Sequence, residues 1–122
     1  MNMTASLLLA SILALSFTGV CISPGYSQED IPVATTYQVY CSRCHGDAGQ
    51  GDGADGATLS PKPRDFTDCA VMSKIPDATI VKAITSGGAS VDLSRDMPAW
   101  GEELSGKKIA ELAAYVRTFC HK

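Results

Sequence analysis

One pentapeptide, Cys41-Ser42-Arg43-Cys44-His45, constrains this chain more than any other stretch. Cysteines three positions apart, with histidine directly after the second, are typical of covalent haem attachment, because two thiols at this spacing can add to the vinyl groups of one haem. Cys41 and Cys44 are then predicted to be thioether anchors. His45 is predicted to be the proximal ligand, since neutral imidazole is a common ligand of haem iron. The run occurs once, so we expect one covalent haem c.

Other chemistries of a Cys-x-x-Cys pair are less consistent with the surrounding sequence. A thiol–disulfide exchange site would need a strand-helix unit of the thioredoxin type around it, and none is evident. A structural zinc site would need a second ligand pair at suitable spacing, and the adjacent Cys44 and His45 are awkward partners on one tetrahedral metal. The pattern therefore favours haem.

The N-terminal part of the 122-residue chain has the features of an export signal. Residues 7–22 form an apolar stretch, and no charged side chain precedes Glu29. This stretch is shorter than the roughly 20 residues that a bilayer span requires, and small residues three and one positions before the cut suit cleavage after Ser27. We therefore expect a signal peptide at 1–27, a mature domain at 28–122 and a periplasmic location. The alternative is an uncleaved anchor, and only then do we expect membrane association.

The charge balance narrows the range of partners. The formal net charge is −3 and no basic stripe is present, so nucleic acid is not expected as a partner. An acidic surface favours solubility and steering towards basic docking patches on other proteins. A domain of this size has little core of its own, so a buried haem would supply a large apolar body for it to pack around.

The first helix is expected to carry the two haem-attachment cysteines, and a loop is expected to follow it. Asp30 followed by Pro32 predicts a helix start, and apolar residues at helical spacing continue it to Cys44. Residues 46–56 are too rich in glycine and aspartate to continue a helix. A phosphate-binding loop would need a preceding strand, and a calcium loop would need acidic ligands where glycines stand. We predict a solvated loop around the haem edge.

The segment 59–66 contains two prolines and is expected to be extended. A carbonyl held in such a rigid segment can accept the second ring proton of His45 and fix the ring's orientation. Pro61 is the first choice for that carbonyl. Lys62 or Arg64 is a candidate partner for a haem propionate, with an ordinary solvated charge as an equal alternative.

Two further helices are predicted towards the C-terminus. One begins at Asp77 and is stopped by Gly87-Gly88. The other begins at Ser105, a good helix cap, and apolar residues at helical spacing carry it almost to the end of the chain. We expect this last helix to cross the first one near Tyr37.

Met97 is the candidate for the sixth position of the iron. It lies in an aperiodic stretch, residues 90–101, directly before Pro98, which restricts the backbone at Met97. A methionine in a loop usually fills core space, but an inferred haem with an open sixth position makes Met97 a candidate axial ligand. Met72 is the weaker alternative. Trp100, like Pro61 and Arg64, is predicted to belong to the haem environment.

The mature part contains a further pair of cysteines, Cys69 and Cys120. In an oxidising compartment such a pair favours a disulfide, which would stabilise the domain by roughly 2–4 kcal/mol. The alternative is that one thiolate, Cys69 more than Cys120, takes the sixth position of the haem instead of Met97, which would lower the reduction potential.

The mature chain resembles class I cytochromes c of the bacterial monohaem type. The resemblance rests on the motifs CSRCH, HGDAGQGDG, PKPRDFT, MPAWG and LSGKKIAELAAYVRT, of which the first and fourth together are specific. It implies a small all-α fold of several helices around one haem c, with Cys41 and Cys44 as covalent anchors. It also implies that His45 and Met97 are the axial ligands, and that the protein transfers single electrons between larger periplasmic redox enzymes.

The expected function is therefore that of an electron carrier and not of an enzyme, because two occupied axial positions leave no place for a substrate. Its expected partners are redox proteins, either periplasmic or membrane-bound. Two alternatives stay open at this point. A haem with a cysteine or an empty sixth position would bind a small gas or reduce peroxide, and an uncleaved N-terminus would make the chain an anchored haem subunit of a respiratory complex.

Overall fold

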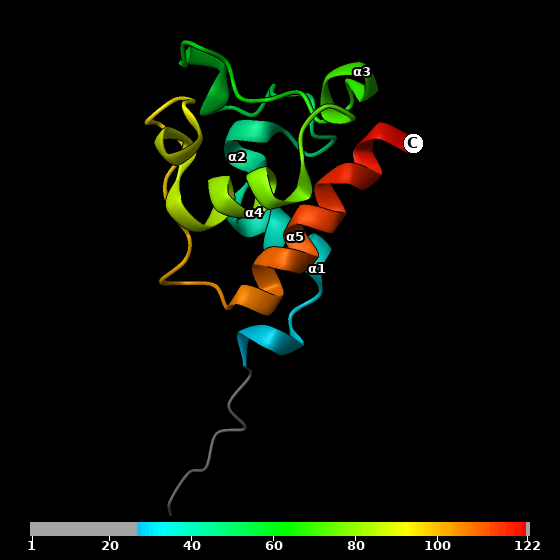
Figure 1. Cartoon of the computed structure of the whole chain (residues 1–122), viewed down its shortest axis with the longest axis vertical. Helices are drawn as coiled ribbons and strands as arrows, with labels where there is room; N and C mark the ends of the chain where they lie inside the picture. Colours follow the sequence, from blue (N-terminus) through cyan, green and yellow to red (C-terminus); the bar gives the residue numbers. More distant parts are fainter. Residues whose placement is uncertain (1–26, 122) are drawn as a thin grey trace, which may run out of the picture.

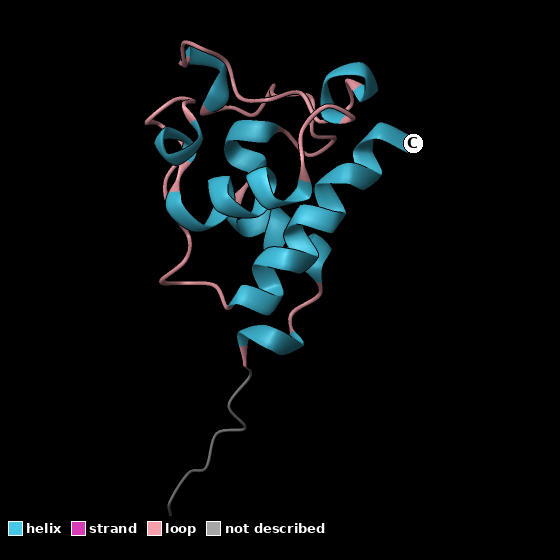
Figure 2. Cartoon of the chain, viewed as in Figure 1, coloured by secondary structure: helices cyan, strands magenta, loops and turns pink. Residues whose placement is uncertain are grey.

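All regular structure in the computed structural model, which describes residues 27–121, is helical (Figure 2). The α-helices are α1 (Val33–Tyr40), α2 (Ser42–His45), α3 (Cys69–Met72), α4 (Asp77–Ser86) and α5 (Gly106–Thr118). Short 3-10 turns accompany them: η1 (Gln28–Asp30), η2 (Gly56–Thr58), η3 (Gly88–Val91) and η4 (Phe119–His121). The predicted all-α class is confirmed for this part of the chain, and none of its helices is long and apolar enough to cross a bilayer. The predicted signal peptide, apart from its last residue, lies outside the described residues.

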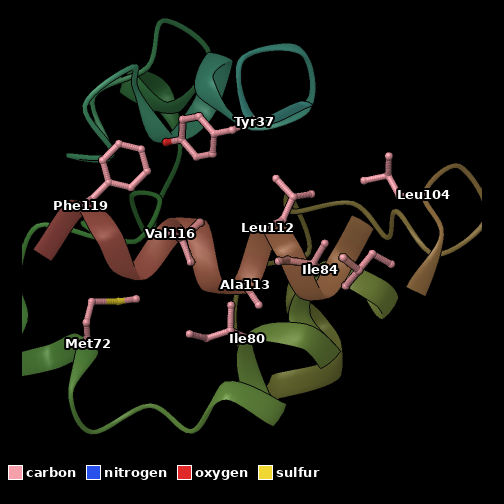
Figure 3. Packing of buried hydrophobic residues seen from close by; sticks show 10 residues of the cluster. Tyr37, Met72, Ile80, Ile84, Leu104, Leu112, Ala113, Val116 and Phe119 are labelled. Carbon is pink, nitrogen blue, oxygen red and sulfur yellow. The ribbon is translucent and has the colours of Figure 1, made fainter. Parts of the chain in front are cut away.

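Helix α5 forms the centre of the fold, with α1 on one side and α4 on the other (Figures 1 and 3). Tyr37 of α1 is fully buried, and its ring centroid lies 5.4 Å from that of Tyr115 and 5.0 Å from that of Phe119. The predicted crossing near Tyr37 is thus confirmed. The buried core comprises Tyr37, Met72, Ile80, Ile84, Leu104, Ile109, Leu112, Ala113, Val116 and Phe119.

The two C-terminal helices begin and end as their sequences predict. The Ser105 hydroxyl accepts a hydrogen bond from the backbone N–H of Lys108 at 3.1 Å, which satisfies one of the free amides at the start of α5. Helix α4 begins at Asp77 and ends before Gly87, whose φ of 81° is accessible at low cost only to glycine.

The first helix differs from its prediction. Asp30 does not cap it: this residue lies in η1, and its carboxylate accepts a hydrogen bond from the Ser27 hydroxyl at 3.0 Å. Pro32 stands at the cap position of α1, and its carbonyl accepts the first helical bond, from Thr36 N–H at 3.0 Å. The helix is also interrupted at Cys41, with φ −121° and ψ −40°, so that α2 forms a separate turn carrying the CSRCH run.

A buried lysine that the sequence patterns did not reveal holds the N-terminal segment in place. Lys108 is 1% exposed, and its ammonium donates to the carbonyl oxygen of Ile31 at 2.7 Å and to a Glu111 carboxylate oxygen at 2.8 Å. The Glu29 carbonyl accepts a longer bond of 3.4 Å from the same group. A buried charge is tolerated only when it is paired in this way, so the clamp couples residues 29–31 to α5.

The Cys69–Cys120 disulfide is present, with the two Cα atoms 5.1 Å apart, and it joins α3 to the C-terminal turn η4. The predicted disulfide is confirmed. The alternative in which a free Cys69 or Cys120 thiolate ligates the iron is wrong, because both sulfurs are bonded to each other.

Candidate haem-binding site

A largely apolar cavity of about 330 Å³ lies beside the CSRCH run. Its walls come from separate parts of the chain: α2 with the end of α1, the segment 59–66, α3 with α4, the stretch 91–100, and the inner face of α5. Cys41, Cys44 and His45 all line this one cavity. A flat apolar ligand bound there would therefore contact nearly every element of the fold.

The two cysteines of the run are free thiols and partly buried. Burial raises the pKa of Cys41 to about 12, with a further contribution from Cys44, and burial also raises the pKa of Cys44. Both side chains are therefore neutral thiols near neutral pH. Redox-active and zinc-binding cysteines instead have lowered pKa values, and no cluster of metal-binding side chains of the usual kind occurs among the described residues. This environment is consistent with thiols that become thioethers.

His45 is oriented by a backbone carbonyl on the segment that follows the glycine-rich loop. Its Nδ1 lies 3.1 Å from the carbonyl oxygen of Arg64. A carbonyl only accepts, so Nδ1 carries the proton and Nε2 keeps its lone pair for a metal. Burial lowers the pKa of His45, against a smaller opposite effect of the Arg64 hydrogen bond, and a lowered pKa favours the neutral ring that binds iron.

The choice of Pro61 as the carbonyl partner of His45 is wrong. The carbonyl that lies beside the imidazole belongs to Arg64, three residues after Pro61. Pro61 nevertheless lines the cavity, as do Lys62 and Arg64. Pairing of Lys62 or Arg64 with a haem propionate stays a prediction.

The glycine-rich loop is confirmed as a loop, apart from the short turn η2, and it connects the anchor to the segment 63–66. Gly51 N–H donates to the His45 carbonyl at 2.8 Å, and Phe66 N–H donates to the Gly49 carbonyl at 2.7 Å. Gly51 has φ of 75°, and a Cβ placed there would lie 2.5 Å from the Pro63 carbonyl oxygen. Only glycine allows this turn and this approach together.

Met97 lines the same cavity as His45, and backbone hydrogen bonds hold the chain at Met97 and at Trp100. Gly88 N–H donates to the Met97 carbonyl at 3.0 Å, and Trp100 N–H donates to the Ile84 carbonyl at 2.9 Å. The stretch is thus attached to the end of α4, as a loop must be if one of its side chains is to keep a defined position. Trp100 also lines the cavity, and its ring lies 5.1 Å from that of Tyr40, edge to face.

Phe66 and Tyr40 are cavity residues that sequence reasoning missed. The Phe66 ring stacks on the His45 imidazole, with centroids 4.5 Å apart and planes 16° apart. Tyr40 lines the cavity directly before Cys41. The sequence alone could have indicated both, because Tyr40 is an aromatic residue beside the motif and Phe66 is one at the end of the segment 59–66. Met72 is 2% exposed and also lines the cavity, so position alone does not separate it from Met97.

The residues present fit a covalently bound haem c. Neutral thiols, an imidazole with a free Nε2 and an apolar cavity converge on one place, each from a different contact. Cys41 and Cys44 would hold the vinyl-derived carbons, and His45 would hold the iron.

Comparisons with known proteins point to the same kind of cofactor. The family described as "Cytochrome C oxidase, cbb3-type, subunit III" matches residues 31–116. The chain is 33% identical over 96 residues to "Cbb3-type cytochrome c oxidase subunit FixP" of Azorhizobium caulinodans, covering 79% of this chain and 29% of that protein. It is 35% identical over 85 residues to "Cbb3-type cytochrome c oxidase subunit CcoP" of Azospirillum sp. (strain B510), covering 67% of this chain and 26% of that protein.

A solved structure shares the fold. The protein titled "KustC0563 c-type cytochrome" matches with a TM-score of 0.58 and 25% identity, over 73% of this chain and 98% of that one. The chain spans less than a third of the curated relatives named above, so the likeness concerns the domain that carries the haem motif. The protein therefore belongs to the cytochrome c family represented by subunit III of cbb3-type oxidases, and it is an electron-transfer protein with covalently bound haem c.

Proposed function

We propose that this chain is an exported one-electron carrier whose haem c is anchored by Cys41 and Cys44 and ligated by His45 and Met97. The bound haem would supply an iron that gains and loses one electron. The protein's own residues determine how readily it does so, by holding the axial side chains, by excluding water and by presenting the haem edge to a partner.

One observation carries the proposal: His45 and Met97 line the same apolar cavity, and each is fixed by backbone contacts of its own. His45 is held through Arg64, and the Met97 stretch is held at the end of α4. Axial ligands that are pre-positioned in this way change little between oxidation states, which keeps the reorganisation energy of electron transfer low. Histidine and methionine together favour a relatively high potential.

The cavity walls support a carrier more than a catalyst. They are dominated by apolar side chains, including Ile80, Ile84, Leu112 and Val116. Such walls restrict water near the iron and provide few groups for proton transfer to a bound substrate. With a thioether in the sixth position, a substrate would have to displace Met97 before any reaction could occur.

The partners that we propose are redox proteins, and the comparisons favour a respiratory setting. The relatives are named as subunits of cbb3-type cytochrome c oxidase. We propose that this chain passes electrons along a respiratory chain that ends in an oxidase of this kind, from the periplasmic side. A second candidate is a haem subunit fixed to such a complex, which the same printed names favour.

Near-infrared absorption of the ferric protein tests the ligation. We expect the weak sulfur-to-iron band of methionine coordination in the wild type and in Met72→Leu, and its loss in Met97→Leu, which removes the thioether at similar volume. Carbon monoxide should bind the ferrous haem rapidly only in Met97→Leu. Rapid binding to the wild type at neutral pH, with no near-infrared band, would instead support an open sixth position and a gas-binding or peroxidatic role.

Mass spectrometry of the exported protein, together with membrane fractionation, separates the carrier from the anchored subunit. A soluble holoprotein that begins at Gln28 is expected for a carrier released by cleavage after Ser27. A full-length chain that remains with the membrane would support the anchored-subunit alternative instead.

A further inference from the structure

We propose that the Cys69–Cys120 disulfide is a reversible lock on one wall of the haem cavity, opened by a dithiol reductant. This inference goes beyond electron carriage by the haem. It depends on haem c occupying the cavity, and it does not depend on Met97 being the sixth ligand.

The wall in question, here called the wall segment, comprises residues 69–77, which form α3 and the turn into α4. It contributes Met72 and Ile75 to the cavity, and Met72 is 2% exposed. Helix α3 has only four residues. A helix of that length is not stable by itself, so its attachments decide where it lies. Figure 1 shows α3 beside the C-terminal end of the described chain.

Two attachments hold the wall segment against the end of the chain. At its start, Cys69 is bonded to Cys120. Further along, the guanidinium of Arg117 donates to the Met72 carbonyl at 2.9 Å, to the Ile75 carbonyl, and to an Asp77 carboxylate oxygen at 2.5 Å. The disulfide thus fixes the start of the wall segment, and the rigid guanidinium of Arg117 fixes its later part.

The Cys120 end of the disulfide is also connected to the face of His45. Phe119, which precedes Cys120, is 3% exposed, and its ring lies 6.3 Å from that of Phe66 at 22°. Phe66 in turn stacks on the imidazole of His45 at 4.5 Å. A shift of the chain end is therefore transmitted to the packing around the proximal ligand.

The disulfide joins residues that are accessible to solvent, and neither of its cysteines lines the cavity. Cys69 is exposed and Cys120 is partly exposed. Cys120 also borders a shallow surface hollow that Asp47 and Thr67 help to line. A dithiol thiolate can attack one sulfur to form a mixed disulfide, and the second thiol of the reductant then resolves it. Two electrons and two protons pass to the protein, leaving two free thiols and an oxidised reductant.

Opening the bond removes a crosslink between residues 51 positions apart, and the wall segment keeps the Arg117 hydrogen bonds and the core packing of Met72. Its local opening becomes more frequent, because the constraint that paired it with the chain end is gone. Water and small ligands then enter the haem cavity more often. Greater exposure to water stabilises the additional positive charge of ferric haem, so the reduction potential falls.

The test uses the holoprotein with its haem held ferrous electrochemically, with and without dithiothreitol. Alkylation and mass spectrometry report whether the two thiols are free. Hydrogen exchange should rise in residues 69–77, and carbon monoxide binding should accelerate by about tenfold or more once the bond is open. The Cys69→Ala/Cys120→Ala variant should reproduce both changes and show a lower midpoint potential.

Lys108→Met is the matched control, because it weakens the attachment of α5 to residues 29–31 at the opposite end of that helix. It should raise exchange there while leaving the wall segment and the potential unchanged. Free thiols without any change in exchange or potential would overturn the proposal, as would a disulfide that dithiothreitol opens only in denaturant. Rapid carbon monoxide binding both with and without dithiothreitol would contradict Met97 ligation instead. Hydrogen exchange and the midpoint potential would then decide whether the disulfide controls the wall segment. If the double variant does not fold, the dithiothreitol comparison decides.

Discussion

Cys41, Cys44 and His45 lie on or beside α2, a helical turn of four residues that cannot hold its own conformation. Neighbouring groups therefore supply the order. The buried hydroxyl of Tyr37 donates to the carbonyl of Gly46, the residue after His45, at 2.7 Å. Burial raises the pKa of Tyr37, which favours the protonated hydroxyl that donates this bond.

Tyr37→Phe keeps the ring and removes this hydrogen bond. The Gly46 carbonyl still accepts from Gly49 N–H at 3.1 Å. We therefore expect a loss of about 1 kcal/mol in the free energy of unfolding, measured on the ferric holoprotein in guanidinium chloride. Ser73→Ala removes a comparable hydroxyl–carbonyl bond, to Ala70, at an exposed site. It should cost less than about 0.5 kcal/mol, and equal losses in the two variants would contradict the role given to Tyr37.

At the scale of elements, the cavity depends on loops that only glycine can form, as well as on helices. The loop after His45 lies so close to the segment 63–66 that the backbone atoms of the two are in direct contact. That approach brings the Arg64 carbonyl to the imidazole. The stretch containing Met97 is attached to the end of α4 by the same kind of backbone bonds.

Gly51→Ala should disturb this loop in a way that another glycine substitution does not. At φ of 75° a Cβ is unfavourable, and it would also meet the Pro63 carbonyl. We expect a loss of at least about 1 kcal/mol in the free energy of unfolding, with a lower yield of holoprotein. Gly106→Ala is the control: a Cβ there meets nothing within 4 Å, at the start of α5. It should stabilise by up to about 1 kcal/mol, and a similar loss in both would contradict the argument.

At the scale of the whole molecule, a small helical core is completed by attachments between its ends and its centre. Lys108 couples the N-terminal segment to α5, while Arg117 and the disulfide couple the wall segment to the C-terminal end of α5. These contacts join residues that are far apart in the sequence. They are the contacts that hydrophobic periodicity does not reveal.

Lys108→Met should release the N-terminal segment. The Ile31 and Glu29 carbonyls lose their shared donor, so we expect a cost of about 1–3 kcal/mol, with faster hydrogen exchange in residues 28–33. Lys107→Met is the neighbouring control, because the side chain of Lys107 is 67% exposed and its pairs with Glu29 and Glu111 are surface pairs. Its effect on the free energy of unfolding should be smaller than that of Lys108→Met, because solvent screens such pairs. Slow exchange retained in Lys108→Met would show that the clamp is dispensable.

Cys41→Ala/Cys44→Ala tests how far the fold depends on its cofactor. Without covalent haem, the apolar walls of the 330 Å³ cavity face water. A domain of this size has little other core to compensate. We expect loss of covalent haem by mass spectrometry, together with lower helicity and a broad, weakly cooperative thermal transition in circular dichroism. A sharp transition at the wild-type temperature would show that the polypeptide folds independently of haem.

Local sequence patterns were sufficient to predict the helices α4 and α5, the glycine-rich loop and the pairing of Cys69 with Cys120. Each of these depends on residues close together, or on a small set of cysteines in which few pairings are possible. Pro61 and Asp30 were assigned wrongly for a common reason. Whether a carbonyl reaches an imidazole, or a carboxylate reaches a helix end, depends on where the chain turns after the residue in question.

The sequence by itself determined where the haem-attachment motif lies, at Cys41, Cys44 and His45, because the chemistry of attachment requires those residue types at that spacing. Only the tertiary structure decided which carbonyl orients His45 and which aromatic ring packs on it. It also decided that Lys108 joins residues 29–31 to α5 and that Arg117 joins the wall segment to α5. The physical reason is distance along the chain. Covalent chemistry at a motif is local, whereas these contacts form only when the packing of α1, α4 and α5 brings remote groups together.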